Sequence, residues 1–232
     1  MRGTLGRATT LIGIVLAVGV LAALALLLRG RRTPRSAAKE EAPVAMVDPR
    51  DLLFSLPTLA DALPVGEKAE AIPADALHLH EDDWRQVEFV GLTQQDEVEA
   101  ELGQLRSFIR EHRKGIGFNE VYVRRNRPDG LAPLRIEVGA LEPLLPPAAQ
   151  RHALVVGREP WGPSVVSGYA MEIGPNAVLY VQVVGRHVTV VGLSLGWRKG
   201  NSPKADALLA AISRTLQLRL VDWPAAAWVQ LE

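Results

Sequence analysis

The chain of 232 residues contains no cysteine, which excludes a disulfide framework, thiolate catalysis and metal sites built on cysteine ligands. Its formal net charge is zero, so no overall field attracts nucleic acid or an acidic partner. Common catalytic motifs are also missing: the sequence has no Gly-x-Ser-x-Gly elbow, no Gly-rich phosphate loop ending in Lys-Ser or Lys-Thr, and no His-Glu-x-x-His helix. These absences favour a non-catalytic protein with no resident cofactor and no nucleic-acid partner.

One long hydrophobic run lies near the amino terminus and predicts a single transmembrane helix. Residues 11–28 carry no charged and no polar side chain, and about 20 apolar residues match a hydrocarbon core about 30 Å thick. A cleavable signal peptide is the alternative, because Ala23, Leu24 and Ala25 have the small-x-small form of a cleavage site. The apolar run continues to Leu28 with no polar region before that site. We therefore expect an uncleaved signal-anchor and a lipid bilayer as its partner.

Arginines flank the apolar run on both sides, and their density predicts the orientation. Arg2 and Arg7 precede the run, whereas a denser group follows it. That group consists of Arg29, Arg31, Arg32 and Arg35. The positive-inside rule then places the large carboxyl-terminal part in the cytoplasm.

Composition divides the chain into four parts. A tail of residues 1–10 and the apolar run of 11–28 precede a tether of residues 29–77, in which proline recurs among alanine and charged residues. Proline at this density opposes long helices and strand pairing, so the tether has a predicted reach of roughly 35–40 Å as a flexible coil. Residues 51–56 and 59–63 are too apolar for a passive spacer, and would pack on the chain's own domain or dock on a partner. The soluble domain is predicted to span residues 78–232.

Alternating and helical patterns predict the elements of that domain. Strands are expected at residues 84–90, 118–125, 134–138, 153–156, 165–173 and 218–221. The residues 127–130 form a predicted turn between the second and third of these strands. A helix is expected from a capping box at Thr93 and Asp96 to a C-cap at Gly115, and a second from Ser202 to Leu216.

The strongest predicted hairpin joins residues 178–184 and 187–195 through Gly185 and Arg186. A regular register places Val181 on the same face as Val188 and Val190, and leaves Tyr180 on a face suited to water or a light covering layer. Hairpins combined with two amphipathic helices predict an α+β fold, in which a mainly antiparallel sheet is covered by helices.

Three clusters are candidate sites. His78 and His80 lie two residues apart, so on a strand they would share a face and could bind a divalent metal, with a solvated polar segment as the alternative. A loop containing Arg158, Glu159 and Trp161 is a candidate recognition loop. A basic patch on the predicted hairpin could contact phospholipid, or be a solvated rim. That patch consists of Arg124, Arg125, Arg127 and Arg135.

The leading functional prediction is a membrane-anchored, non-catalytic interaction or assembly domain with a protein partner. The alternative is an enzyme or ligand-binding domain whose site combines distant residues, with metal dependence through His78 and His80. A deep pocket with converging His, Asp or Glu side chains would favour the alternative.

Overall fold

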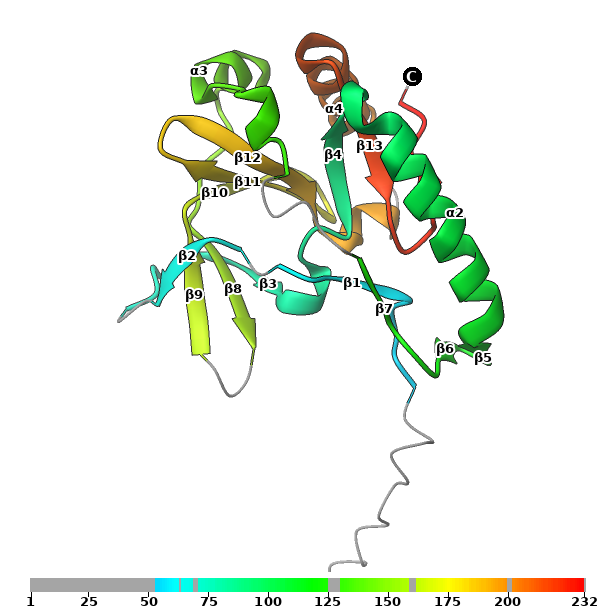
Figure 1. Cartoon of the computed structure of the whole chain (residues 1–232). Helices are drawn as coiled ribbons and strands as arrows, with labels where there is room; N and C mark the ends of the chain where they lie inside the picture. Colours follow the sequence, from blue (N-terminus) through cyan, green and yellow to red (C-terminus); the bar gives the residue numbers. More distant parts are fainter. Residues whose placement is uncertain are drawn as a thin grey trace, which may run out of the picture. The chain divides into compact units, whose positions relative to one another are not determined.

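The computed structural model describes residues 53–62, 64–68, 71–124, 130–158, 162–199 and 202–231 (Figure 1). The chain divides into two units, Met1–Val47 and Asp48–Glu232, and every described residue belongs to the second. Within these ranges no helix is both long and apolar enough to cross a bilayer. The predicted membrane helix, residues 11–28, lies outside the described residues, so it stays a prediction.

The fold is α+β, as predicted, and is built on an antiparallel main sheet. In spatial order its strands are β10 (Gly168–Gly174), β11 (Ala177–Val184), β12 (His187–Leu193), β4 (Val87–Gly91), β13 (Leu218–Asp222) and β14 (Ala227–Trp228). The predicted hairpin of β11 and β12 is confirmed, and Gly185 adopts the positive φ of 63° that its tight turn requires.

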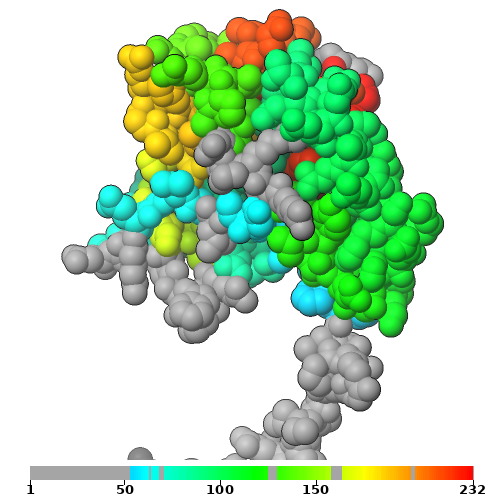
Figure 2. Space-filling view, viewed as in Figure 1, coloured from blue at the N-terminus to red at the C-terminus, as the bar shows by residue number. Residues whose placement is uncertain are grey.

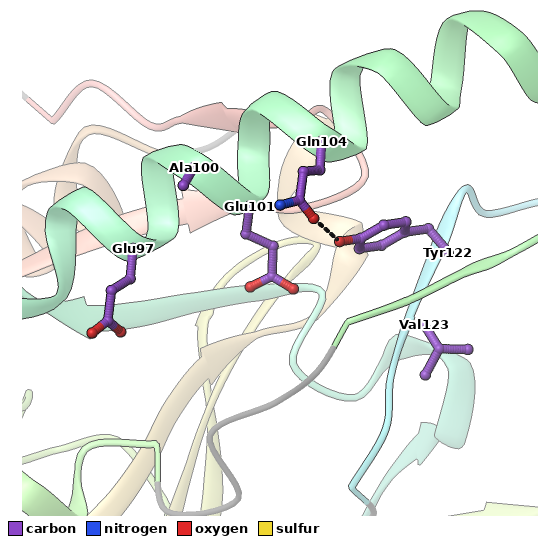
Figure 3. Close-up of a pocket in the computed structure, with 6 residues that line it drawn as sticks. All are labelled: Glu97, Ala100, Glu101, Gln104, Tyr122 and Val123. Carbon is purple, nitrogen blue, oxygen red and sulfur yellow. Dashed lines mark hydrogen bonds between the residues drawn. The ribbon is translucent and has the colours of Figure 1, made fainter.

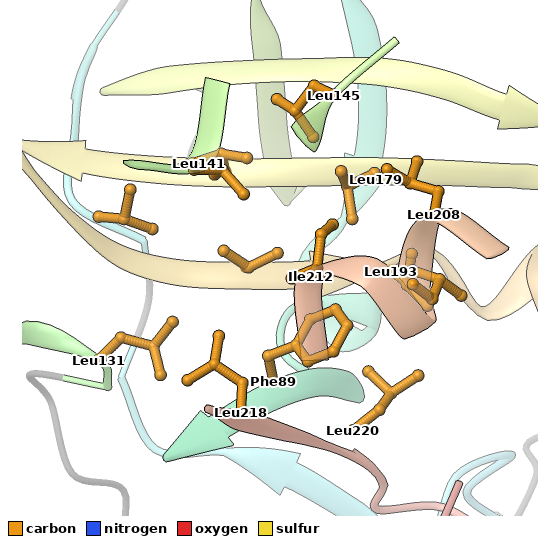
Figure 4. Packing of buried hydrophobic residues seen from close by; sticks show 14 of the residues in the cluster. Phe89, Leu131, Leu141, Leu145, Leu179, Leu193, Leu208, Ile212, Leu218 and Leu220 are labelled. Carbon is orange, nitrogen blue, oxygen red and sulfur yellow. The ribbon is translucent and has the colours of Figure 1, made fainter. Parts of the chain in front are cut away.

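Helix α4 (Pro203–Leu216) packs on one face of the main sheet, together with the short helix α3 (Val138–Leu141). The Ser202 hydroxyl caps α4 as predicted, because its Oγ accepts a hydrogen bond of 3.2 Å from the amide of Ala205. Ile212 is fully buried near Phe89 of the sheet (Figure 4), and Leu209 is fully buried in the same cluster. The apolar face of α4 therefore contributes side chains to the largest core cluster.

Helix α2 (Gln95–His112) covers part of the opposite face of the main sheet. Val98, Leu102 and Leu105 are fully buried, at the spacing that the sequence predicts. The predicted capping box at Thr93 and Asp96 does not form. The preceding 3₁₀ turn, Leu92–Gln94, instead places Gln94 at the N-cap position of α2. The Gln94 side chain accepts a hydrogen bond of 3.2 Å from the amide of Gly91.

A second, four-stranded sheet covers the rest of that opposite face. Its order is β2 (Gly66–Lys68), β9 (Gly162–Val166), β8 (Leu154–Arg158) and β3 (Leu77–His80), with β3 parallel to β8. The ring of Trp84 stacks on that of Tyr180 with centroids 5.1 Å apart, and both rings are buried with side chains of the second sheet. This stack joins the two sheets.

Two short ribbons complete the fold. β1 (Thr58–Ala60) pairs in parallel with β7 (Tyr122–Arg124), and β5 (Arg113–Lys114) forms a small antiparallel hairpin with β6 (Gly117–Phe118). Phe54 adds a bridge to Phe118. The first described residues therefore lie against the β5–β6 hairpin, and in Figure 2 the blue atoms near the start of the described chain lie beside green atoms.

The β11–β12 register differs from the prediction because of a bulge at Thr189. The pairing moves from Val183 with Val188 to Gln182 with Val190. One extra residue reverses the side-chain alternation, so Val190 joins the cluster of Tyr180 rather than that of Val181. Tyr180 is fully buried, which corrects the expectation of a wet face.

The predicted hairpin of residues 118–138 is wrong. β7 pairs with β1, and the expected returning strand is replaced by a 3₁₀ turn at Ala132–Leu134 followed by α3. Pro133 cannot donate to a strand ladder, and Arg135 adopts a left-handed φ of 53° that breaks the extended path. Leu134 and Ile136 nevertheless pack against the core from this irregular segment.

Two strands and the first residue of a third lie before the domain boundary predicted at residue 78. β1, β2 and Leu77 of β3 fall in the segment predicted as a tether, so its described part contributes strands to the fold. Proline opposes regular pairing only at its own position, and each of these strands is short enough to fit between prolines. The predicted strand of residues 165–173 is divided between β9 and β10 at Ser167, which precedes Gly168 with its φ of 145°.

Candidate functional site

A groove of about 730 Å³ runs between helix α2 and strand β7 (Figure 3). The helix contributes the carboxylates of Glu97 and Glu101, one turn apart. The full lining consists of Glu97, Ala100, Glu101, Gln104, Tyr122 and Val123. The groove thus combines negative charge, hydrogen-bonding groups and apolar surface.

Strand β7 forms the second wall of the groove through its alternating side chains. Val123 is 55% exposed, whereas Tyr122 is half-buried and donates a hydrogen bond of 3.0 Å from its hydroxyl to Oε1 of Gln104. The Tyr122 ring also meets the ring of Phe108 edge to face, with centroids 5.5 Å apart. These contacts hold the strand beside α2 and leave Val123 facing outward.

The next residue of β7, Arg124, points inward and is fully buried. Its guanidinium donates to the backbone oxygen of Arg85 at 2.8 Å, to Oε1 of Gln86 at 3.2 Å and to Oγ1 of Thr58 at 3.3 Å. It also lies over the ring of Trp223, 4.8 Å from the ring centroid. Arg124 therefore ties β7 and β1 to the main sheet.

Glu88 is the buried anion of this network and is only 2% exposed. Its Oε2 accepts from Nε of Arg85 at 2.6 Å, and its Oε1 accepts from the indole of Trp223 at 3.0 Å. The backbone amide of Arg85 in turn donates to the Tyr180 hydroxyl at 2.8 Å. The network consequently connects the stacked rings between the sheets with the cluster beneath α2.

Burial and charge act differently on the two arginines. Burial lowers the pKa of Arg124 to about 10, although Glu88 and Glu101 favour its charged form. Burial also lowers the pKa of Arg85, but the attraction and hydrogen bond of Glu88 outweigh burial and leave that pKa raised. Both guanidinium groups are protonated at neutral pH, so Glu88 offsets two buried cations.

The predicted basic patch is corrected by the burial of Arg124, which cannot take part in a surface patch. From the sequence alone, an arginine on a strand is expected to be solvent-exposed. The prediction fails because the residues that bury Arg124 are distant along the chain. Arg135 is exposed, while Arg125 and Arg127 lie outside the described residues. The side chain of Arg158 and all of Glu159 and Trp161 also lie outside them, so the recognition loop stays a prediction.

His78 and His80 share the exposed face of β3, as their spacing predicts, with Leu79 buried between them. Nδ1 of His80 lies 3.5 Å from a carboxylate oxygen of Asp82 and accepts a hydrogen bond of 3.2 Å from the Asp82 amide. Across the described ranges, no group of three His, Asp or Glu side chains is arranged to hold a metal ion. Metal binding at these histidines stays a prediction.

The groove was not predicted from the sequence. The only available signal is that Glu97 and Glu101 follow each other at helical spacing on the polar side of an expected helix. Such spacing is ordinary for a solvated helix face. The second wall could not be identified because β7 was expected to pair with a later strand.

Comparison of the chain with protein-family models, with curated proteins and with solved structures finds no match. The class that the described part defines is an α+β domain with one antiparallel main sheet, a smaller covering sheet and a groove beside helix α2. Any functional statement must therefore come from the sequence and from this geometry.

Proposed function

We propose that the chain is a single-pass, membrane-anchored, non-catalytic interaction domain whose folded unit lies in the cytoplasm. Residues 11–28 supply the anchor, because their length and apolar character suit a bilayer. The denser arginine group after this run supports the cytoplasmic side for the folded unit.

The observation that carries the interaction role is the groove between α2 and β7. A protein segment with apolar side chains fits its chemistry, because Val123 stands 55% exposed on the β7 wall. The buried network beneath β7 holds this wall in place. A rigid wall lowers the ordering cost of binding, which suits a recognition surface.

Changing Val123 to Glu tests the groove. We expect the amount of partner protein recovered with the Val123→Glu variant to fall about tenfold or more. A charge in an interface removes an apolar contact and is costly to desolvate. The measurement is quantitative mass spectrometry of proteins that co-purify with the full chain from detergent-solubilised membranes.

Val184→Glu is the matched control, because Val184 is 46% exposed at the far end of the β11–β12 hairpin. Partners that the wild-type chain and Val184→Glu retain and Val123→Glu loses would support the groove. An identical set of proteins recovered with both variants and the wild-type chain would refute it.

A further inference from the structure

The tip of the β5–β6 hairpin carries the most exposed large apolar side chain of the described part. Ile116 is 101% exposed at the turn between Lys114 and Gly117. Isolated exposed apolar side chains are common on protein surfaces and need no explanation by themselves. The surroundings of Ile116 make it unusual, because further exposed apolar and basic side chains gather around it.

Leu53 and Phe54 extend the apolar surface of this tip. Phe54 exchanges both backbone hydrogen bonds with Phe118, at 2.8 Å and 2.9 Å, yet its side chain remains 48% exposed. Leu53 is 44% exposed and lies directly over Gly117, where its Cβ would leave too little room for a side chain on that glycine. The membrane-facing tip, as we define it, comprises Leu53, Phe54, Arg113, Lys114 and Ile116.

The charge of the tip suits an anionic surface. Arg113 and Lys114 are both exposed on β5, and the Arg113 guanidinium lies 5.8 Å from the centroid of the Phe118 ring. Of the nearby carboxylates, Glu120 lies 3.6 Å from Nδ1 of His112. The cations Arg113 and Lys114 lie three and two residues before Ile116, whereas the acidic residues stand farther from it along the chain, at Glu111 and Glu120.

The chain enters the folded unit at this same tip. The described residues begin at Leu53, which touches the hairpin, and 24 residues separate it from the end of the apolar run at Leu28. At full extension a segment of this length spans at most roughly 80 Å. The apolar run is thus connected to the folded unit at the tip, and not at the β11–β12 hairpin.

We propose that the membrane-facing tip docks on anionic phospholipid, with Ile116 inserted among the headgroups and Arg113 and Lys114 paired with phosphates or carboxylates of the lipids. This inference rests on the membrane anchor of the proposed function. An exposed apolar side chain on the same hairpin as two exposed cations gains from both burial and surface charge at such an interface. Docking would fix the orientation of the groove relative to the membrane.

The absence of cysteine permits a direct test with single labels. The full chain carrying Ile116→Cys is labelled with an environment-sensitive fluorophore and reconstituted into vesicles of phosphatidylcholine, with or without phosphatidylserine. We expect nitroxide-bearing lipids to quench the label in phosphatidylserine vesicles. The same label at Val184→Cys, an exposed position on the β11–β12 hairpin, should remain unquenched.

Changing Arg113 and Lys114 together to Gln, in the labelled Ile116→Cys chain, separates charge from insertion. Each basic residue near an anionic surface contributes about a fivefold factor, so we expect the ratio of docked to free tip to fall about 25-fold. Equal quenching at positions 116 and 184 would overturn the docking. A blue shift of the position-116 label that depends on protein concentration and occurs without lipid would also overturn it, because such a shift indicates contact between copies of the chain.

Flotation of the same labelled vesicles distinguishes the two proposals. A chain that floats with the vesicles but shows no quenching at position 116 retains its anchor and refutes only the docking of the tip. A chain that fails to float refutes the anchor itself, and with it the docking that depends on the anchor.

Discussion

Replacing Glu88 by Gln is expected to destabilise the folded unit by about 3–5 kcal/mol, because it removes the carboxylate paired with the buried Arg85 guanidinium and the attraction that favours the charged form of Arg124. Glu88 is 2% exposed and directly contacts Arg85 and the indole of Trp223. Glutamine has nearly the same shape, so the change removes charge with little loss of packing. Urea unfolding of the full chain in non-ionic detergent, followed by circular dichroism, measures the loss.

Glu120→Gln is the control for this variant, because the Glu120 side chain is 62% exposed and its contact with His112 is a surface pair. An exposed pair contributes at most about 1 kcal/mol, so this control should unfold close to the wild-type midpoint. A loss in Glu88→Gln no larger than that of the control would show that Glu88 does not hold the network together. The groove wall at Val123 would then need another support.

Replacing Trp84 by Ala is expected to cost about 3–5 kcal/mol, the usual range for deleting a large aromatic side chain from a core. Trp84 is 2% exposed and stacks on Tyr180 between the main sheet and the covering sheet. Gly192 leaves the room that the Tyr180 ring occupies, because a Cβ at this position would overlap the ring. Loss of Trp84 should loosen the covering sheet, which hydrogen exchange of the β8 and β9 amides would detect.

Trp228→Ala is the matched control for the Trp84 variant. Trp228 is half-buried, donates from its indole to Glu99 at 2.7 Å and lies beneath the guanidinium of Arg219. These partners are near the surface, so its removal should cost less than that of Trp84 in the same urea titration. Equal losses in the two variants would contradict the role assigned to the Trp84–Tyr180 stack.

The sequence predicts those elements whose signals are local. Helices α2 and α4 have apolar residues at helical spacing, and the β11–β12 hairpin has a glycine at its turn. Each of these patterns is complete within a few turns or strands of chain. They were therefore recognisable without any knowledge of distant partners.

Long-range pairing explains most of what the sequence did not predict. The partner of β7 is β1, which lies more than 60 residues earlier in a proline-rich segment. The burial of Arg124 follows from that pairing, and with it the position of the groove wall. The bulge at Thr189 is a different case, because a single extra residue in one strand leaves no distinct mark on an alternating pattern.

Extraction of the full chain from membranes with alkaline carbonate is the most direct measurement of whether the chain is anchored in a bilayer. We expect the wild-type chain to remain in the membrane pellet, and a variant with Val18→Lys and Leu21→Lys to be released, since each charge at the centre of a span costs about 2.5–3.5 kcal/mol on insertion scales. Release of the wild-type chain into the supernatant would contradict the membrane anchor.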